Sequence, residues 1–198
     1  MTSPRRLGAP DAKNRALLLD AAERLLLDEG YAAVSSRRVA DRAGLKPQLV
    51  HYYFRTMDDL FLDVFRRRAE EGLEQQALAL AGPQPLRALW RFSIDPTGTA
   101  LTMEYVALAN HRKALRAEIA HYAERFRAAQ VEAVTAAMAR HDLDPVEYPP
   151  LFVTVLISSL SRVLILEQSL GMASGHAESA AFVEELLTRI EGPALAVG

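Results

Sequence analysis

The stretch SSRRVADRAGLKPQLVHYYFRTMDDL, residues 35–60, carries the start and stop signals of three consecutive helices. Ser35 is typical of a helix N-cap and Gly44 of the left-handed residue after a helix end, so a short helix is expected between them. Pro47 suits the first turn of a second short helix, because its missing N–H would have no intrahelical partner there. Thr56, followed three residues later by an aspartate, is the pattern of a reciprocal cap that begins a longer helix.

Helical spacing of apolar residues continues on both sides of this stretch. Apolar residues at Leu18, Ala22 and Leu25 predict a helix over about 11–29 that stops at Gly30. Residues 1–10, with two prolines and two arginines, are expected to form a flexible basic arm. Strong helix formers dominate the composition, so the prediction is an all-α fold of about nine helices. Apart from those at 11–29 and 35–44, the expected helices are 47–54, 56–80, a short one that carries Trp90 between breaks at 82–85 and 95–98, 101–110, 111–140, 146–171 and 176–191.

Composition narrows the class of protein. The 198 residues are 50% hydrophobic and 24% charged, which is typical of one or two packed domains. Without cysteine there is no disulfide, thiolate nucleophile or cysteine-ligated zinc. The N-terminus lacks the apolar stretch of a secretory signal, and the most apolar run, 148–161, is short for a bilayer span. We therefore expect a cytoplasmic protein in which this run forms a buried helix.

The two short helices and the helix before them indicate a helix-turn-helix unit, whose later helix can enter a major groove of DNA. Gln48, His51, Tyr52 and Tyr53 crowd that later helix with polar or amphipathic side chains, where a buried helix would carry Leu and Ala. Residues 1–60 hold ten basic and eight acidic residues, a small excess that carries little weight alone. A small packing unit with solvated polar groups is the alternative interpretation.

Over about residues 12–62 the chain resembles the DNA-binding region of TetR-family transcriptional regulators. Two positions depart from the family pattern, which usually has tyrosine where His51 stands and lysine where Met57 stands. The residues that carry the resemblance are Gly30-Tyr31, Ser35, Arg37-Arg38-Val39-Ala40, Ala43-Gly44-Leu45, Tyr52-Tyr53-Phe54, Thr56 and Asp59-Leu60.

The resemblance implies which residues contact double-stranded DNA. Arg37 and Thr56 would contact phosphates, Tyr52 and Tyr53 the backbone, and residues 46–51 the base edges. The chemistry of the last group agrees, because Gln48 can bind adenine with two hydrogen bonds. Leu49 or Pro47 can pack on a thymine methyl group, Lys46 can reach guanine or a phosphate, and Arg5 and Arg6 can enter the minor groove. The predicted DNA-binding residues are Arg37, Lys46, Pro47, Gln48, Leu49, His51, Tyr52, Tyr53 and Thr56.

The expected domains are 1–60 for DNA binding and 61–198 for effector binding and dimerisation. The segment 151–170 is apolar around most of its circumference, so one face can serve the subunit's core while a twofold mate covers another. Together with the last helix it would form a four-helix interface. The residues expected there are Leu156, Leu160, Leu164, Phe182, Leu186, Leu187 and Ile190. A central helix buried within one subunit is the alternative.

In the resembling family the middle helices enclose an apolar cavity that binds a small molecule. The expectation is a repressor released from a palindromic operator by an apolar or amphipathic effector. Aromatic and methionine residues at helical spacing are equally typical of a filled core. The candidate ligand-binding residues are Trp90, Phe92, Met103, Glu104, Tyr105, Asn110, Tyr122, Phe126 and Arg162.

Two other functional classes have weaker support. Glu118-x-x-His121 has the spacing of di-iron sites in helix bundles, but such sites need a second copy and two further glutamates. We therefore expect no enzyme, no metal and no cofactor. A helical interaction or scaffold protein without specific DNA binding stays open as an alternative.

Overall fold

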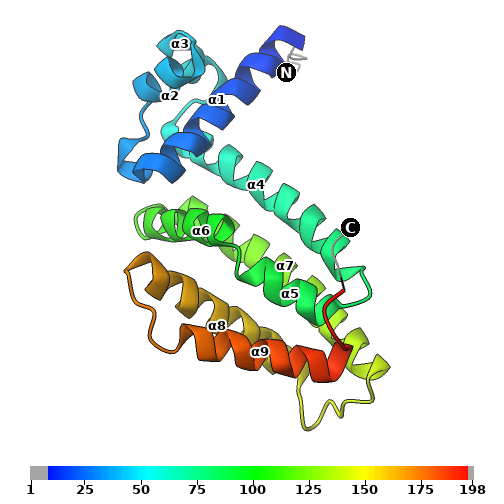
Figure 1. The fold of residues 1–198 in the computed structure, drawn as a ribbon. Coiled ribbons are helices and arrows are strands. Elements are labelled where there is room, and N and C mark those ends of the chain that lie inside the picture. The colour runs from blue at the N-terminus through cyan, green and yellow to red at the C-terminus, as the bar shows by residue number, and fades with distance from the viewer. Residues whose placement is uncertain (1–8, 196–198) are drawn as a thin grey trace. The chain divides into compact units, whose positions relative to one another are not determined.

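The structure, a computed structural model, describes residues 9–195 (Figure 1). This part of the chain contains nine α-helices and one 3-10 turn, with no strand, which confirms the all-α prediction. The helices are α1 (Ala9–Glu29), α2 (Ser36–Ala43), α3 (Pro47–Tyr53), α4 (Met57–Leu80), α5 (Pro85–Ser93), α6 (Pro96–Ala109), α7 (Lys113–Arg140), α8 (Pro150–Ser169) and α9 (His176–Glu191), and the 3-10 turn η1 is Tyr31–Ala33.

Four helices, α1, α6, α7 and α8, begin two or more residues away from their predicted starts, and α7 begins at Lys113, two residues late. Helix α1 begins at Ala9, while Arg5 and Arg6 of the expected arm lie outside the described residues. Helix α6 begins at Pro96, inside the expected break, because the Asp95 carboxylate caps it by accepting a hydrogen bond from the Gly98 N–H at 2.8 Å. Helix α8 begins only at Pro150, since a residue before proline avoids the helical conformation.

The chain divides into two compact units, and the first contains more of the chain than the helix-turn-helix. The first unit runs to Glu70 and includes Ala100–Ala120, while the second holds Glu71–Thr99 and the chain from His121 onward. In the first unit, apolar residues of the helix-turn-helix share one core with α4 and α6. Its fully or almost fully buried members include Leu18, Leu25, Leu26, Val39, Val50, Phe54, Leu60, Val64, Tyr105, Leu108 and Leu115.

Ion pairs join α1 to α4 at the edge of this core. Arg15 pairs with Asp63 at 2.5 Å, and Arg67 pairs with Asp20 at 2.6 Å and Glu23 at 3.0 Å. These side chains are partly exposed, so each pair contributes at most about 1 kcal/mol. Their main effect is to set how α1 lies along the first half of α4.

The second unit has a separate core in which α5 packs against α8 and α9. The Glu191 carboxylate accepts hydrogen bonds from the Leu86 and Arg87 N–H groups, so the end of α9 caps the start of α5. The buried Arg87 guanidinium pairs with Glu184 and donates to the Gly192 carbonyl oxygen. The buried apolar residues of this core are Leu86, Leu89, Trp90, Val134, Ala137, Met138 and Leu187.

Helix α8 is buried on one face only, which corrects the expectation of a buried helix. Its inner face carries Thr154, Ser158, Ser161 and Ile165, and the three hydroxyl groups donate to carbonyl oxygens of their own helix. Small, internally satisfied side chains let α5 approach closely. Within residues 9–195, α8 is also the one helix long and apolar enough to cross a membrane by length and composition, although only 22% of the relevant window is buried.

Candidate nucleic-acid interface

Local caps set the boundaries of α2. The Ser35 hydroxyl accepts a hydrogen bond from the Arg38 N–H at 3.4 Å, as its N-cap position predicts. Gly44 ends the helix in the left-handed conformation, with φ 65° and ψ 29°. The Leu45 N–H then donates to the Ala40 carbonyl oxygen at 2.9 Å. This bond closes the tight turn that leads into α3.

Helix α3 presents one polar face and buries the other. Lys46 is its N-cap and Pro47 occupies the first helical turn, as the sequence predicts. Val50 and the C-cap residue Phe54 lie in the core of the first unit. A second set of α3 residues, together with its N-cap, is exposed on the opposite face, with Tyr52 57% exposed. These exposed residues are Lys46, Pro47, Gln48, His51 and Tyr52.

Two predicted DNA-binding residues of α3 contribute to packing. Leu49 and Tyr53 are half-buried against the core of the first unit. The Tyr53 ring also meets the Tyr52 ring edge-on, with centroids 4.9 Å apart. Of the two residues considered for a thymine methyl contact, Pro47 is therefore the exposed one.

The arginines of α2 differ in their electrostatic environment. Arg38 donates to both carboxylate oxygens of Glu29 at 2.7 Å, and Arg42 pairs with Asp28. Arg37 has an 87% exposed side chain, and its one ion-pair partner in the part of the chain that the structure describes is the distant Asp41, at 4.0 Å. An anion approaching α2 therefore meets Arg37 with most of its charge available, while Arg38 and Arg42 are largely neutralised.

Thr56 and Asp59 form the reciprocal cap predicted at the start of α4. The Thr56 N–H donates to the Asp59 carboxylate at 3.0 Å, and the Asp59 N–H donates to the Thr56 hydroxyl oxygen at 3.1 Å. The hydroxyl group acts here as an acceptor. Its own proton therefore stays available to donate to a phosphate.

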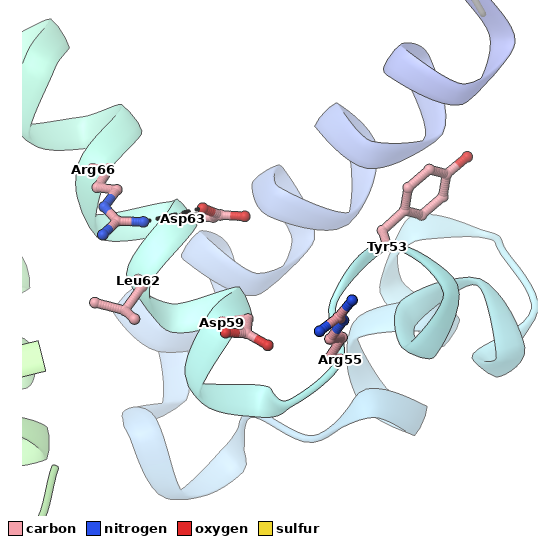
Figure 2. Close-up of a pocket in the computed structure, with 6 residues that line it drawn as sticks. All are labelled: Tyr53, Arg55, Asp59, Leu62, Asp63 and Arg66. Atoms are coloured by element: carbon pink, nitrogen blue, oxygen red, sulfur yellow. Dashed lines mark ion pairs between the residues drawn. The ribbon is translucent and has the colours of Figure 1, made fainter. Parts of the chain in front are cut away.

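Arg55, which the sequence analysis did not single out, lies on the link between α3 and α4 and is exposed. It lines a hollow of about 290 Å³ together with Tyr53 and residues of α4 (Figure 2). Asp59 and Asp63 line the same hollow as Arg55 and Arg66, so its charges balance and it does not favour an anion. Arg55 makes no ion pair with the residues that the structure describes. Arg55 is therefore distinguished by its exposure and the lack of an ion pair among the described residues, and no local sequence motif marks it.

The candidate ligand-binding residues fall into both units. Glu104 accepts a hydrogen bond from the Tyr31 N–H at 2.9 Å, and Tyr105 lies in the first core with its ring 5.0 Å from that of Phe65. Burial and the Glu23 carboxylate raise the pKa of Tyr105 above its ordinary range. Met103 and Asn110, also of the first unit, are exposed.

The other five candidates belong to the second unit. Trp90 is part of its core, and Phe92 faces Phe126 with ring centroids 6.3 Å apart. Tyr122 is buried, with the Arg125 guanidinium 4.8 Å from its ring centroid. Arg162 is exposed on α8.

The candidate interface residues of α8 and α9 divide into exposed and buried sets. Leu156, Phe182 and Leu186 are exposed. Leu187 is 5% exposed and belongs to the subunit's own core, so it cannot lie on an outer face. Leu160, Leu164 and Ile190 pack partly against that core. Five further apolar residues of α8 that the candidate set did not include are also exposed, namely Leu151, Phe152, Val155, Val163 and Leu166.

The acid and histidine of Glu118-x-x-His121 have different surroundings. Glu118 pairs with Arg66 at 2.6 Å, and the exposed His121 lies with its ring 5.5 Å from that of Tyr122. Among the described residues, no group of three or more acidic, histidine or cysteine side chains could hold a metal ion.

Comparison with known proteins finds a family model that matches the helix-turn-helix. Residues 18–64 match the model of the bacterial regulatory proteins of the tetR family. The chain is 27% identical over 122 residues to the HTH-type transcriptional regulator BetI of Rhizobium meliloti (strain 1021), a match that covers 57% of this chain and 60% of that relative.

Solved structures share the fold over most of the chain. A regulator from Saccharomonospora viridis, in complex with choline, has a TM-score of 0.74 at 17% identity, covering 90% of this chain and 95% of its own. A TetR transcription regulator from Haloarcula marismortui has a TM-score of 0.72 at 18% identity, covering 90% and 98%. The matched segment holds α2 and α3 with parts of α1 and α4, so residues 18–64 form a helix-turn-helix domain of the kind found in bacterial regulatory proteins of the tetR family.

Proposed function

We propose that the protein is a transcriptional regulator that binds double-stranded DNA with α3 in the major groove. The observation that carries this proposal is the outer face of α3, where Gln48, His51 and Tyr52 are exposed over a buried Val50. A helix that served only packing would not keep such large side chains in solvent. The two cations that flank this face, Arg37 and Lys46, are exposed and suit the phosphates on either side of a groove.

The individual contacts follow from side-chain chemistry. Gln48 would bind adenine through two hydrogen bonds, and Pro47 would pack on a thymine methyl group. Arg37 and the Thr56 hydroxyl would contact phosphates, with Tyr52 against the backbone. Because Met57 cannot supply the positive charge usual at its position, the exposed Arg55 two residues earlier is a further candidate for a phosphate contact.

We also propose that the protein acts as a homodimer on a palindromic operator. The exposed apolar residues of α8 and α9 would be covered by the same residues of a second subunit. Dimerisation would place two copies of α3 about 34–36 Å apart, the distance between successive major grooves. The outer face consists of Leu151, Phe152, Val155, Leu156, Val163, Leu166, Phe182 and Leu186.

The effector proposed here is an apolar or amphipathic small molecule bound in the second unit. Phe92 lines a pocket of about 630 Å³ that also includes Ala88, Leu195 and two arginines. Arg87 already binds Glu184 and Thr188, whereas the exposed Arg91 makes no ion pair with the described residues. Among the described residues, no carboxylate lines the pocket. An amphipathic molecule with an acidic head group therefore suits it better than the choline cation bound by the Saccharomonospora viridis protein.

Repression would be relieved if the effector favours a spacing of the two α3 helices that does not fit DNA. Tight binding alone changes nothing, because only a difference in affinity between the two states shifts their populations. A reversal from 99:1 to 1:99 needs about a 10⁴-fold preference. By linkage, operator must then weaken effector binding by the same factor.

Fluorescence anisotropy with DNA from beside the gene tests the proposal. Specific, salt-sensitive binding of flanking DNA over random DNA is expected, whereas no binding at any salt concentration would favour an interaction protein without DNA specificity. Decanoate and choline would then be added to the complex. Release by decanoate but not by choline is expected, with decanoate affinity lowered equally by operator. A ligand that binds without changing operator affinity would show that the pocket is not the switch.

A further inference from the structure

The turn between α1 and α2 has no cap of its own. Gly30 ends α1 with φ 77° and ψ 169° and is the N-cap of η1, where a glycine has no side chain to accept the free N–H groups. The Glu104 carboxylate, 73 positions further along the chain, accepts the hydrogen bond from the Tyr31 N–H at 2.9 Å. A carboxylate at this end of a helical turn also meets the positive end of the peptide dipoles. Glu104 thus caps the N-terminal end of η1, although it belongs to α6.

The backbone conformation of this turn favours glycine at position 30. Its φ of 77° is strained for other residues, whereas a Cβ atom there would lie 3.4 Å from Glu104 Oε2, an ordinary van der Waals contact. On its other side the turn is held from α2, because Arg38 donates to the Ala33 carbonyl oxygen at 3.4 Å and pairs with Glu29. The path from α1 into α2 is therefore held by Glu104 from α6 and by two arginines of α2, Arg38 and Arg42, the latter paired with Asp28.

The neighbours of Glu104 hold its backbone in place. Leu101, Tyr105 and Leu108 of α6 are all buried in the core of the first unit. A side chain on such an anchored helix is presented at a defined position, as a positioning group requires. Glu104, one of the candidate ligand-binding residues, thus contacts the turn between α1 and α2 in this structure.

We propose that Glu104 is a positioning residue for DNA binding: by capping the turn at Tyr31 it sets the orientation of α2, and with it Arg37 and α3. The inference rests on the proposed DNA-binding function. Glu104 would not touch DNA itself. Loss of the cap would lower the fraction of molecules in which α2 and α3 are correctly placed, and the apparent affinity for DNA falls with that fraction. Any shift of α6 that lengthens the contact beyond hydrogen-bonding distance would have the same effect.

The test compares Glu104→Leu and Glu104→Gln in the full-length protein with Glu124→Leu, a control at an exposed acid of α7. Glu104→Leu should weaken operator binding about fivefold to tenfold, since roughly a tenth to a fifth of molecules would keep the competent turn. The slope of log K against log salt should stay unchanged, because no phosphate contact is lost. Glu104→Gln keeps an acceptor oxygen and should bind within about twofold of the wild type.

Hydrogen exchange at the Tyr31 amide reports directly on the hydrogen bond between this amide and Glu104. Exchange should accelerate in Glu104→Leu and stay slow in Glu104→Gln and Glu124→Leu. If Glu104→Leu does not fold, Glu104→Asp decides, because it keeps the charge but withdraws the carboxylate by one methylene and should also weaken binding. Operator binding with wild-type affinity by Glu104→Leu, or by Glu104→Asp where Glu104→Leu does not fold, would overturn the positioning role. A wild-type protein that binds no DNA would instead overturn the proposed function.

Discussion

At the scale of single residues, Arg37 and Arg42 of α2 offer a matched pair for DNA binding. Arg37→Ala should weaken binding to all sequences alike and lower the salt slope by about one unit, because a phosphate contact is lost. Arg42→Ala should change the slope less, since Asp28 already neutralises this arginine. Gln48→Ala should cost roughly 1–3 kcal/mol at one base pair only. Anisotropy over a salt series and a set of single-base operator variants measures all three. Equal losses on random DNA for Arg37→Ala and Gln48→Ala would contradict these roles.

Tyr105, also at this scale, is buried, and its hydroxyl group has no hydrogen-bond partner among residues 9–195. Tyr105→Phe should match the wild type or exceed its stability by about 1 kcal/mol at pH 8, because the desolvation cost of the hydroxyl disappears. The raised pKa favours the neutral phenol in the folded state. Stability is therefore complete below the unfolded pKa of about 10 and is lost as pH rises above it. Denaturant unfolding at pH 8 and 10.5 should show a smaller loss in Tyr105→Phe than in the wild type and in the exposed control Tyr52→Phe. A large loss in Tyr105→Phe at pH 8 would indicate a bound water on the hydroxyl.

At the scale of an element, the end of α2 depends on the backbone of Gly44. Its φ of 65° is strained for residues with a Cβ atom, yet no atom lies within 4 Å of where that Cβ would stand. Gly44→Ala should therefore lower the free energy of unfolding by about 1 kcal/mol through backbone strain alone. Gly44→Asn should lose less, because asparagine tolerates this conformation. Urea unfolding of both variants measures the difference, and no loss in either would show that α2 can end differently.

At the scale of the whole molecule, the exposed apolar face of α8 and α9 should bring two subunits together. Leu156→Glu and Phe182→Glu should each shift the protein to monomers at micromolar concentration, because a buried unpaired carboxylate is costly in an apolar interface. Leu78→Glu is the control, since Leu78 is 79% exposed on α4 and lies outside this face. Sedimentation velocity gives the oligomeric state. A monomeric wild type, or monomers produced only by the control, would refute the interface.

Most helices and the helix-turn-helix could be predicted from the sequence, because their signals are local. Ser35 and the Thr56 cap act on backbone groups within three residues of themselves, and Gly44 closes the helix that it follows. The polar face of α3 could be predicted for the same reason. It follows from helical periodicity and from the residue types at neighbouring positions. The resemblance to one family rests on the same local stretch.

The tertiary structure decided which of these side chains are available. Arg37, Arg38 and Arg42 are alike in sequence, and only the end of α1 beside them shows that Glu29 and Asp28 neutralise two of the three. Glu104 lies 73 positions from the amide that it caps, and Leu187 has the spacing of an interface residue yet lies in the core. Helical periodicity predicts whether a helix face is apolar or polar, but it does not predict which helix packs against that face. Which helix covers a face depends on packing between segments that are distant in the chain. The ion pairs of the arginines, the cap from Glu104 and the burial of Leu187 were therefore decided by the tertiary structure.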